Sequence, residues 1–184
     1  MKILKYVLIG LGVIIVAVFG YLIYLGIFAS VDIRKGTEGG ELLVYERVVG
    51  NFSKVGEPME RISKTLKDKY GLENVDCMAI YYDNPEQVPQ EKLRSDAGCL
   101  IPAGVKVDTA ALARKFSVKL IPRKEYIITD FPYHGTPSIF VSVMKVYPAL
   151  KKYFAENKVN GEFQIAEIYD MKQVKIRYRV GDFK

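Results

Sequence analysis

The sequence predicts an α+β fold in which duplicated βαββ units form a curved antiparallel sheet with two helices, preceded by one N-terminal transmembrane helix. Three observations support this fold. One long apolar stretch lacks charge, two later segments have apolar residues at helical spacing, and strand-like runs surround each of these segments in the same order. The 184 residues suffice for one ordinary domain and an attachment. We expect an anchor at residues 1–31, a linker at 32–40 and the domain at 41–184.

The apolar stretch is predicted to be a membrane anchor. Tyr6–Phe28 would form a helix about 34 Å long, enough to cross a hydrocarbon core about 30 Å thick. The stretch is longer than the apolar region of a signal peptide, and the large Phe28 makes a poor cleavage site. We therefore expect a single-pass membrane protein whose contact with the lipid bilayer is made by Tyr6–Phe28. The basic residues on the two sides of the stretch nearly balance, so the side of the membrane that holds the domain stays open.

The first unit is predicted to run strand, helix, strand, strand. Apolar side chains recur along one face of its helix, and Gly71 stands where helices commonly end. The predicted elements are a strand at Glu41–Val49, a helix at Glu57–Tyr70, and a hairpin of Cys77–Asp83 and Ala97–Pro102.

The second unit repeats this order. Its predicted elements are a strand at Lys119–Thr129, a helix at Ser138–Asn157, and a closing pair of strands at Glu162–Asp170 and Val174–Val180. The seam between two such units would leave a concave surface, which is a natural place for a small molecule to bind.

The charge of the chain argues against a nucleic-acid partner. The net charge is +6, and the excess of basic residues is interleaved with acidic ones. The densest basic stripe alternates with apolar residues, which predicts the solvated face of an edge strand. It consists of Lys172, Lys175, Arg177 and Arg179. Nucleic-acid-binding surfaces usually carry denser charge, so no nucleic acid is expected.

The cysteine and histidine content excludes two other classes. Two cysteines exclude a disulfide scaffold, and the single His134 argues against a usual zinc site, so neither a metal nor a cofactor is expected. If Asp83 pairs near Ala97 in the hairpin, Cys77 lies about 13 Å from Cys99. A disulfide requires Cα atoms within about 7 Å, so we expect two free thiols unless the register differs.

Glu167 is the sharpest candidate for chemistry. Strand alternation places Ile165, Glu167 and Tyr169 on one face. One interpretation is that this face is exposed to solvent. The other is a carboxylate at the floor of an aromatic cleft, where it would receive a cationic ligand or act as a general base with a raised pKa.

Tyrosines on strands and at strand ends are the second set of candidates. Each is compatible with ordinary sheet packing, but aromatic rings around one carboxylate suit an apolar or cationic ligand. Beside Glu167, the candidate ligand-binding residues are Tyr45, Tyr82, Tyr133 and Tyr169, from a wider set that includes Tyr81, Tyr126 and Phe131.

Several segments resemble the GyrI-like domain family. Ala79–Pro89 (AIYYDNPEQVP) and Leu93–Cys99 (LRSDAGC) resemble its signature. Phe131–Tyr133, Val146–Leu150 and Ala166–Asp170 resemble a membrane-anchored branch that includes a testis-expressed receptor for autophagy of the endoplasmic reticulum. The likeness extends over about residues 41–183, and the N-terminal span matches as well.

The resemblance implies a small-molecule-binding domain like the effector-binding halves of multidrug-responsive transcription activators, with Glu167 matching the family's cleft glutamate. Some relatives hydrolyse strained rings, so an alternative is a hydrolase in which Glu167 activates water and Tyr82 or Tyr169 assists. A third class is a membrane-tethered interaction module with an unknown protein partner. The receptor's disordered tail has no counterpart before Lys184, and no helix-turn-helix precedes the domain, so neither receptor activity nor transcriptional activation is expected.

Overall fold

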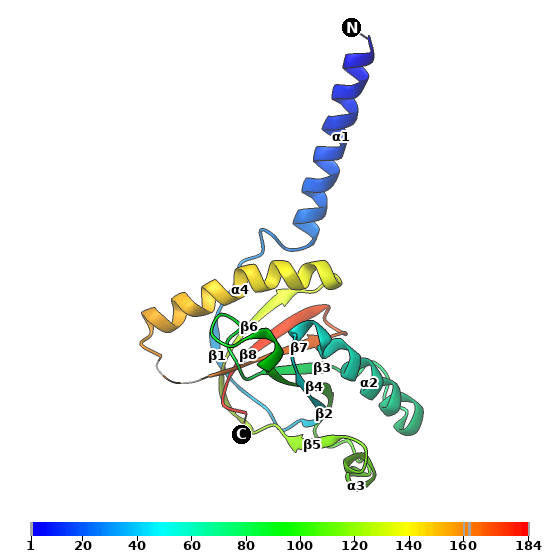
Figure 1. Cartoon of the computed structure of the whole chain (residues 1–184), viewed down its shortest axis with the longest axis vertical. Helices are drawn as coiled ribbons and strands as arrows, with labels where there is room; N and C mark the ends of the chain where they lie inside the picture. Colours follow the sequence, from blue (N-terminus) through cyan, green and yellow to red (C-terminus); the bar gives the residue numbers. More distant parts are fainter. Residues whose placement is uncertain (1, 160, 162, 184) are drawn as a thin grey trace.

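The computed structural model describes residues 2–159, 161 and 163–183, and it confirms the predicted fold class. A long helix, α1 (Lys2–Tyr24), leaves a domain in which helices pack on one curled antiparallel sheet (Figure 1).

After β1 (Arg34–Glu38), the first unit contains β2 (Leu42–Val49), the short 3-10 helix η1 (Phe52–Val55), α2 (Gly56–Tyr70), β3 (Cys77–Tyr81), the 3-10 turn η2 (Gln90–Lys92) and β4 (Arg94–Ile101). Then α3 (Thr109–Ala113) and β5 (Ser117–Leu120) lead to the second unit: β6 (Lys124–Pro132), α4 (Thr136–Glu156), β7 (Gln164–Asp170) and β8 (Lys175–Gly181).

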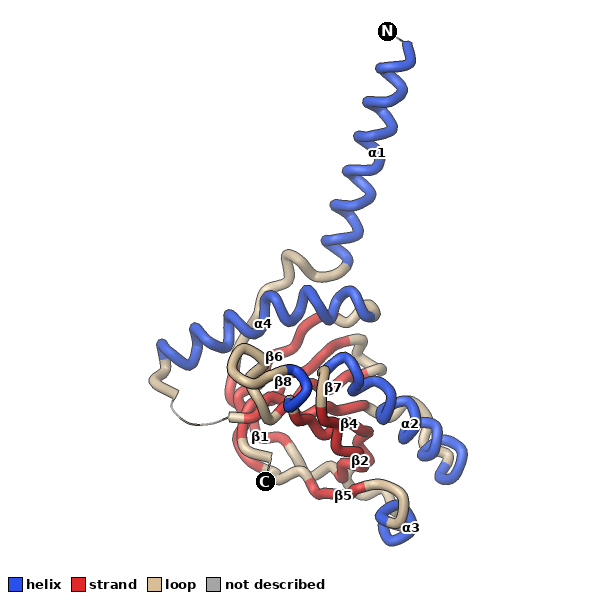
Figure 2. Tube along the Cα trace, viewed as in Figure 1, coloured by secondary structure: helices blue, strands red, loops and turns tan. Residues whose placement is uncertain are grey.

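The order of the strands shows the duplication. The sheet runs β1-β6-β8-β7-β3-β4-β2-β5, and every pairing is antiparallel. β7 and β3 pair at the seam of the two units, and each unit then continues outward through its hairpin partner and its first strand. The strands curl into a half-barrel, with β1 and β5 as the added edges (Figure 2).

Both faces of the curled sheet are buried. On the helix-covered face, Ile62 and Leu66 of α2 pack with Val44, and Val146 and Leu150 of α4 pack with β8. On the inner face the curl packs strands against one another, and this core consists mainly of Leu43, Met78, Ile80, Leu100, Ile128, Ala166 and Ile168. Side chains of successive residues on a strand therefore point into two different cores.

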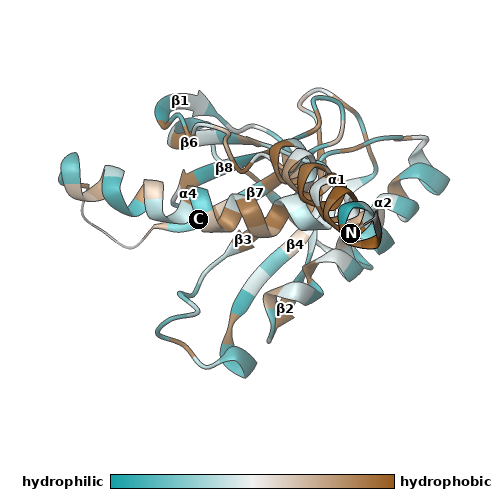
Figure 3. Ribbon diagram, turned by 90° about the horizontal axis from the view of Figure 1, so that it is seen from above, coloured by the Kyte–Doolittle hydropathy of each residue, from teal (hydrophilic) through white to brown (hydrophobic). Residues whose placement is uncertain are grey.

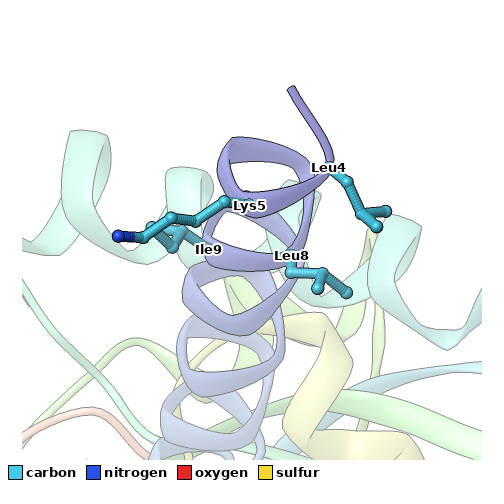
Figure 4. A pocket seen from close by; sticks show the side chains of 4 residues that line it. All are labelled: Leu4, Lys5, Leu8 and Ile9. Atoms are coloured by element: carbon cyan, nitrogen blue, oxygen red, sulfur yellow. The ribbon is translucent and has the colours of Figure 1, made fainter. Parts of the chain in front are cut away.

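Helix α1 is long and apolar enough to cross a membrane. Its span Ile3–Tyr24 has a mean hydropathy of 2.6 over its most apolar window, and none of that window is buried. It forms a nearly continuous apolar rod when viewed from above (Figure 3). Near its start, the side chains of Leu4, Lys5, Leu8 and Ile9 project outward from the helix surface (Figure 4).

Two segments differ from the sequence-based prediction. Residues 34–38 of the predicted linker form β1, which pairs with β6, and their polar sequence has no apolar alternation that would have revealed a strand. The strand predicted at Lys119–Thr129 is split at Pro122, because proline cannot donate a ladder hydrogen bond; β5 pairs with β2 and β6 with β8. Glu162, the expected start of the closing strands, lies outside the described residues, as do Met1 and Lys184.

The basic stripe does not lie on an edge strand. β8 lies between β6 and β7, so the prediction of an edge position was wrong. Arg179 is only 3% exposed, and its guanidinium donates to Glu38 and Glu41. Arg177 donates to Asp130 and Glu38. These charges are neutralised within the domain, on the inner face of the sheet.

The register of the β3–β4 hairpin also differs from the prediction. Cys77 lies directly opposite Cys99, because the ladder continues to Arg94, whose backbone and guanidinium both donate to Asp83. Hydrogen-bonded positions alternate along this ladder, and Leu100 N donates to Asp76 O, so the cysteines occupy a non-hydrogen-bonded pair with Cα atoms about 4.5 Å apart. Their sulfur atoms are 2.9 Å apart, and both thiols are free. The distance argument against a disulfide was therefore wrong.

We expect a mild thiol oxidant such as diamide to join Cys77 and Cys99. Cys77 is partly exposed and reacts first, whereas the hydrogen bond with Cys77 and burial raise the pKa of the Cys99 thiol. The bond would stabilise the fold by roughly 3 kcal/mol by restricting the unfolded chain. Intact mass should fall by the mass of two hydrogens, and the melting temperature should rise, with Cys77→Ser as the unchanged control. Full alkylation of both thiols after oxidation would contradict the expectation.

Candidate functional site

Glu167 lies near the middle of β7, at the seam between the two units. Strand pairing places it opposite Ala79 of β3 on one side and opposite Tyr178 of β8 on the other. Its side chain points to the helix-covered face and is only 3% exposed. The structure thus excludes the interpretation in which this strand face is open to solvent.

Tyrosine phenols surround the Glu167 carboxylate. Tyr169, two residues along the same strand face, donates to Oε2 at 2.9 Å, and Tyr81 at the end of β3 donates to the same oxygen at 3.0 Å. Tyr147 reaches down from α4 toward Oε1 at 3.4 Å. Tyr178 packs edge-on against the Tyr147 ring, and its hydroxyl is 2.6 Å from Ser142 Oγ of α4. Both units and one helix therefore contribute to a single cluster, which we call the Glu167 cluster.

The Glu167 cluster lacks a positive charge. Among the described residues, no lysine, arginine or histidine forms an ion pair with Glu167, whereas the other buried acid, Asp96, pairs with both Arg47 and Lys119. Burial raises the pKa of Glu167, and the phenol hydrogen bonds only partly oppose this shift. Burial and the nearby carboxylate raise the pKa values of Tyr81, Tyr147 and Tyr169 as well, so the phenols stay protonated as donors.

Two hydroxyls on the same sheet face have unused hydrogen-bonding capacity. Thr129 lies opposite Tyr178, and Ser95 lies opposite Tyr81, so they flank the cluster on its two sides. Both side chains are fully buried, and neither hydroxyl has a hydrogen-bond partner. A buried polar atom without a partner is costly, so these positions are suited to accept or donate to a group that enters the cluster.

The structure brings together three of the five candidate ligand-binding residues. Glu167 and Tyr169 are hydrogen-bonded, and the Tyr133 ring packs edge-on against the Tyr169 ring with centroids 5.7 Å apart. Tyr133 is therefore an outer neighbour of the cluster rather than a direct partner of the carboxylate.

The other two candidates, Tyr45 and Tyr82, lie on the opposite face of the sheet around a second buried acid, Asp96. Tyr82 donates to Asp96 Oδ2 at 2.6 Å, and Lys119 donates to both the Tyr82 hydroxyl and Asp96 at 2.9 Å. Lys119 also stands over the Tyr45 ring, 4.9 Å from its centroid, and Arg47 completes the set with an ion pair to Asp96. Burial alone would raise the pKa of Asp96, but these donors outweigh burial, and the net shift is downward.

Three tyrosines of the Glu167 cluster were not selected from the sequence. Tyr147 fits the apolar stripe of its helix, and Tyr178 fits the apolar positions between basic residues, so both are typical core residues by pattern. The β7–β8 turn contained a usable signal, because a hairpin that pairs Asp170 with Lys175 necessarily pairs Glu167 with Tyr178. Tyr81 belonged to the wider aromatic set, and only the β3–β7 pairing shows that it reaches the carboxylate.

A cavity of about 400 Å³ lies elsewhere, at the rim of the inner face. It is lined by charged and apolar residues that include Glu41, Asp76, Leu100, Asp170, Lys172 and Arg179. Glu167 is not part of this lining, since its cluster is filled by the phenol rings. Within the described part of the chain, no three His, Cys, Asp or Glu side chains are grouped so that they could hold a metal ion.

Comparisons with known proteins agree with this fold. No protein-family model matches the chain. Testis-expressed protein 264 of Homo sapiens is 28% identical over 174 residues, covering 87% of this chain and 52% of its own length. The Mus musculus homolog is also 28% identical over 174 residues, covering 87% of this chain and 53% of its own. The chain therefore spans about half the length of these two relatives.

A bacterial relative and a solved structure give the same fold. A DNA gyrase inhibitor of Escherichia fergusonii is 36% identical over 64 residues, covering 31% of this chain and 41% of its own. The crystal structure of the EcmrR C-terminal domain, which has a GyrI-like fold, superposes with a TM-score of 0.51 at 12% identity, covering 82% of this chain and 94% of that one.

The Asp96 interactions give an expected dependence of stability on pH. Because the folded-state pKa of Asp96 is lowered, its contribution to stability is present above the unfolded-state value of about 3.9 and is lost as the pH falls through the folded-state value. Asp96→Asn should lose roughly 2–4 kcal/mol at neutral pH, with a smaller deficit in acid. Denaturant unfolding between neutral and acidic pH measures this. Glu125→Gln, which removes an ion-paired side chain that is 63% exposed, should stay within about 0.5 kcal/mol; an equal loss in both variants would contradict the assignment.

Proposed function

Because the chain is homologous to Testis-expressed protein 264 and has a GyrI-like fold, we propose that it is a membrane-anchored domain that binds an apolar, cationic small molecule at Glu167. The observation that carries the proposal is a carboxylate only 3% exposed that is held by phenols and has no basic partner among the described residues. Helix α1 supports the membrane part of the proposal, since it is long and apolar enough to cross a bilayer.

The charge balance of the cluster favours a cation. A buried ionised carboxylate is unfavourable unless a positive charge or several hydrogen bonds compensate it, and here phenols provide only the hydrogen bonds. A cationic ligand would supply the missing charge in a region of low dielectric, where the attraction is stronger than in water. Aromatic faces around the carboxylate add cation–π attraction and an apolar surface for the rest of the molecule.

Entry of a ligand requires the phenols to move. The Tyr147 contact with Glu167, at 3.4 Å, is the longest of the three hydrogen bonds, and Tyr147 is the only one of these tyrosines carried by a helix. We infer that α4 and its Tyr147 yield first, while Tyr81 and Tyr169 remain on the rigid strands. The proposed site does not include Tyr45 and Tyr82, because they lie with Asp96 on the other face of the sheet.

The test uses the full-length chain in nanodiscs of neutral lipid. Tetraphenylphosphonium should bind and raise the melting temperature, while the neutral triphenylphosphine oxide should bind more weakly. A ligand present at 100 times its dissociation constant stabilises the fold by about 2.7 kcal/mol. Glu167→Gln keeps the size of the side chain and removes its charge, so the affinity for the cation should fall roughly ten-fold or more.

The matched control is Glu125→Gln, the same substitution at an exposed position of β6. Its affinity for the cation should equal that of the original chain, and empty nanodiscs report the partition of the cation into lipid. Equal binding by the Glu167 and Glu125 variants would overturn the proposal, as would the lack of any binding to the original chain.

The raised pKa of Glu167 predicts how binding depends on pH. A cation favours the ionised carboxylate, so affinity is full above the pKa of Glu167 and falls below it toward the affinity of the Glu167→Gln variant, which has no charge there. Because the pKa is raised, this fall should begin at a pH above the ordinary value of 4.5. Calorimetric titrations across this range, with Glu167→Gln as a pH-independent reference, measure the effect. A cation affinity that is unchanged down to the ordinary value would contradict it.

A further inference from the structure

The outward face of α4 carries large apolar side chains. Ser142, Val146 and Leu150 point to the sheet and are buried. On the opposite side, Phe140 is 69% exposed and Met144 is 76% exposed, whereas a helix face in contact with water is normally polar. Neighbouring exposed apolar side chains of this size mark an interaction surface.

The contacts between α1 and the domain place this face next to the end of α1. Lys145 of α4 donates to the backbone oxygen of Ile27 at 2.6 Å, three residues after α1 ends. The Tyr24 ring stacks on His134 with centroids 4.1 Å apart, so the single histidine joins α1 to the domain. Leu25 is buried against the domain. Helix α4 lies across the base of α1, on the side from which α1 leaves the domain (Figure 1).

We propose that the outward face of α4, with Phe140 and Met144, lies in the interfacial layer of the same bilayer that α1 crosses. This inference rests on the membrane anchoring in the proposed function. The headgroup layer on each side of the hydrocarbon core is about 5–8 Å thick. A helix attached through one lysine side chain to Ile27, three residues after the span ends, lies within or against that layer.

The composition of the region fits a lipid surface better than a protein partner. The apolar face continues into Ile27 and Phe28, which are 38% and 67% exposed beside the end of α1. Farther along α4, Lys151 is exposed, and a lysine can extend its charge to lipid headgroups while its stem remains apolar; the neighbouring Lys152 pairs with Glu156. Apolar side chains followed by basic ones on one helix are typical of helices that lie in the membrane interface.

The placement deepens the proposed function, because α4 also carries Tyr147 of the Glu167 cluster. The same helix would touch the bilayer with its outward face and cover the carboxylate from its flank. The ligand class is thereby narrowed to molecules that partition into the membrane, and they would reach Glu167 past α4 without crossing bulk water.

The test exploits the lack of tryptophan in the sequence, which makes any introduced tryptophan the sole reporter. Variants of residues 1–184 are reconstituted in two parallel sets of phosphatidylcholine vesicles, which contain phosphatidylcholine brominated either near the glycerol end or toward the methyl end of its chains. Phe140→Trp and Met144→Trp report on α4. Val13→Trp in α1 is the positive control, and Leu120→Trp on β5, at a site 65% exposed at the far end of the domain, is the negative control (Figure 1).

Glycerol-end bromine should quench the tryptophan emission of the Phe140→Trp and Met144→Trp variants well above that of the Leu120 variant, with blue-shifted spectra, whereas methyl-end bromine should quench the Val13 variant most. Quenching no greater than that of the Leu120 variant would overturn the proposal. A blue shift without bromine quenching would also overturn it, since a protein and not lipid would then cover the face. If the Val13 variant is not quenched either, the membrane anchoring of the proposed function fails together with it, whereas a quenched Val13 variant confines the failure to α4.

Discussion

The antiparallel pairing of β7 with β3 is the interaction on which the rest of the domain depends. It joins two units that would otherwise each end in an unprotected edge, and it completes the curl that buries the inner face. The pairing also sets Glu167 opposite Ala79, whose small side chain leaves room for Met59 and Val55 above the sheet. Because Tyr81 comes from one unit and Tyr169 from the other, the Glu167 cluster exists only when both units are folded and paired.

The sheet buries two carboxylates, one on each face, and compensates them by different means. Asp96 has Arg47, Lys119 and Tyr82 around it, so its charge is balanced within the chain and the arrangement stabilises the fold. Glu167 has phenols alone, which solvate the carboxylate without neutralising it. An added positive charge lowers the free energy of a carboxylate that is already ion-paired only a little, whereas it lowers the free energy of an unpaired buried carboxylate much more. This difference separates Asp96, whose charge is balanced within the chain, from Glu167, the acid at which we propose binding.

Local patterns predicted most elements, while long-range register decided the rest. The two helices, Gly71 as the end of α2 and the βαββ order follow from apolar spacing and turn residues, which act within one element. Which strand faces which acid depends on pairing between distant segments, so Tyr82 and Tyr169 look alike in sequence but enter opposite faces. The predicted hairpin register placed Cys77 four residues from the position opposite Cys99, whereas the real register places the two cysteines directly opposite each other. The edge strand β1 carries no apolar pattern, because three of its five residues are exposed and Glu38 pairs with Arg177 and Arg179 instead of entering an apolar core.

In the proposed membrane arrangement, the contacts between α1 and the domain fix the orientation of the domain relative to the anchor. Lys145 on Ile27 and His134 on Tyr24 remove the swivel that a flexible tether of the same length would allow. A domain held in this way keeps the side that carries α1 toward the membrane and holds β5 at a constant distance from the membrane surface. Its contacts with other molecules are then restricted to a thin layer of water beside the membrane. A molecule that contacts β5 or α3 must approach from the aqueous side of that layer, whereas a molecule that diffuses within the membrane reaches α4.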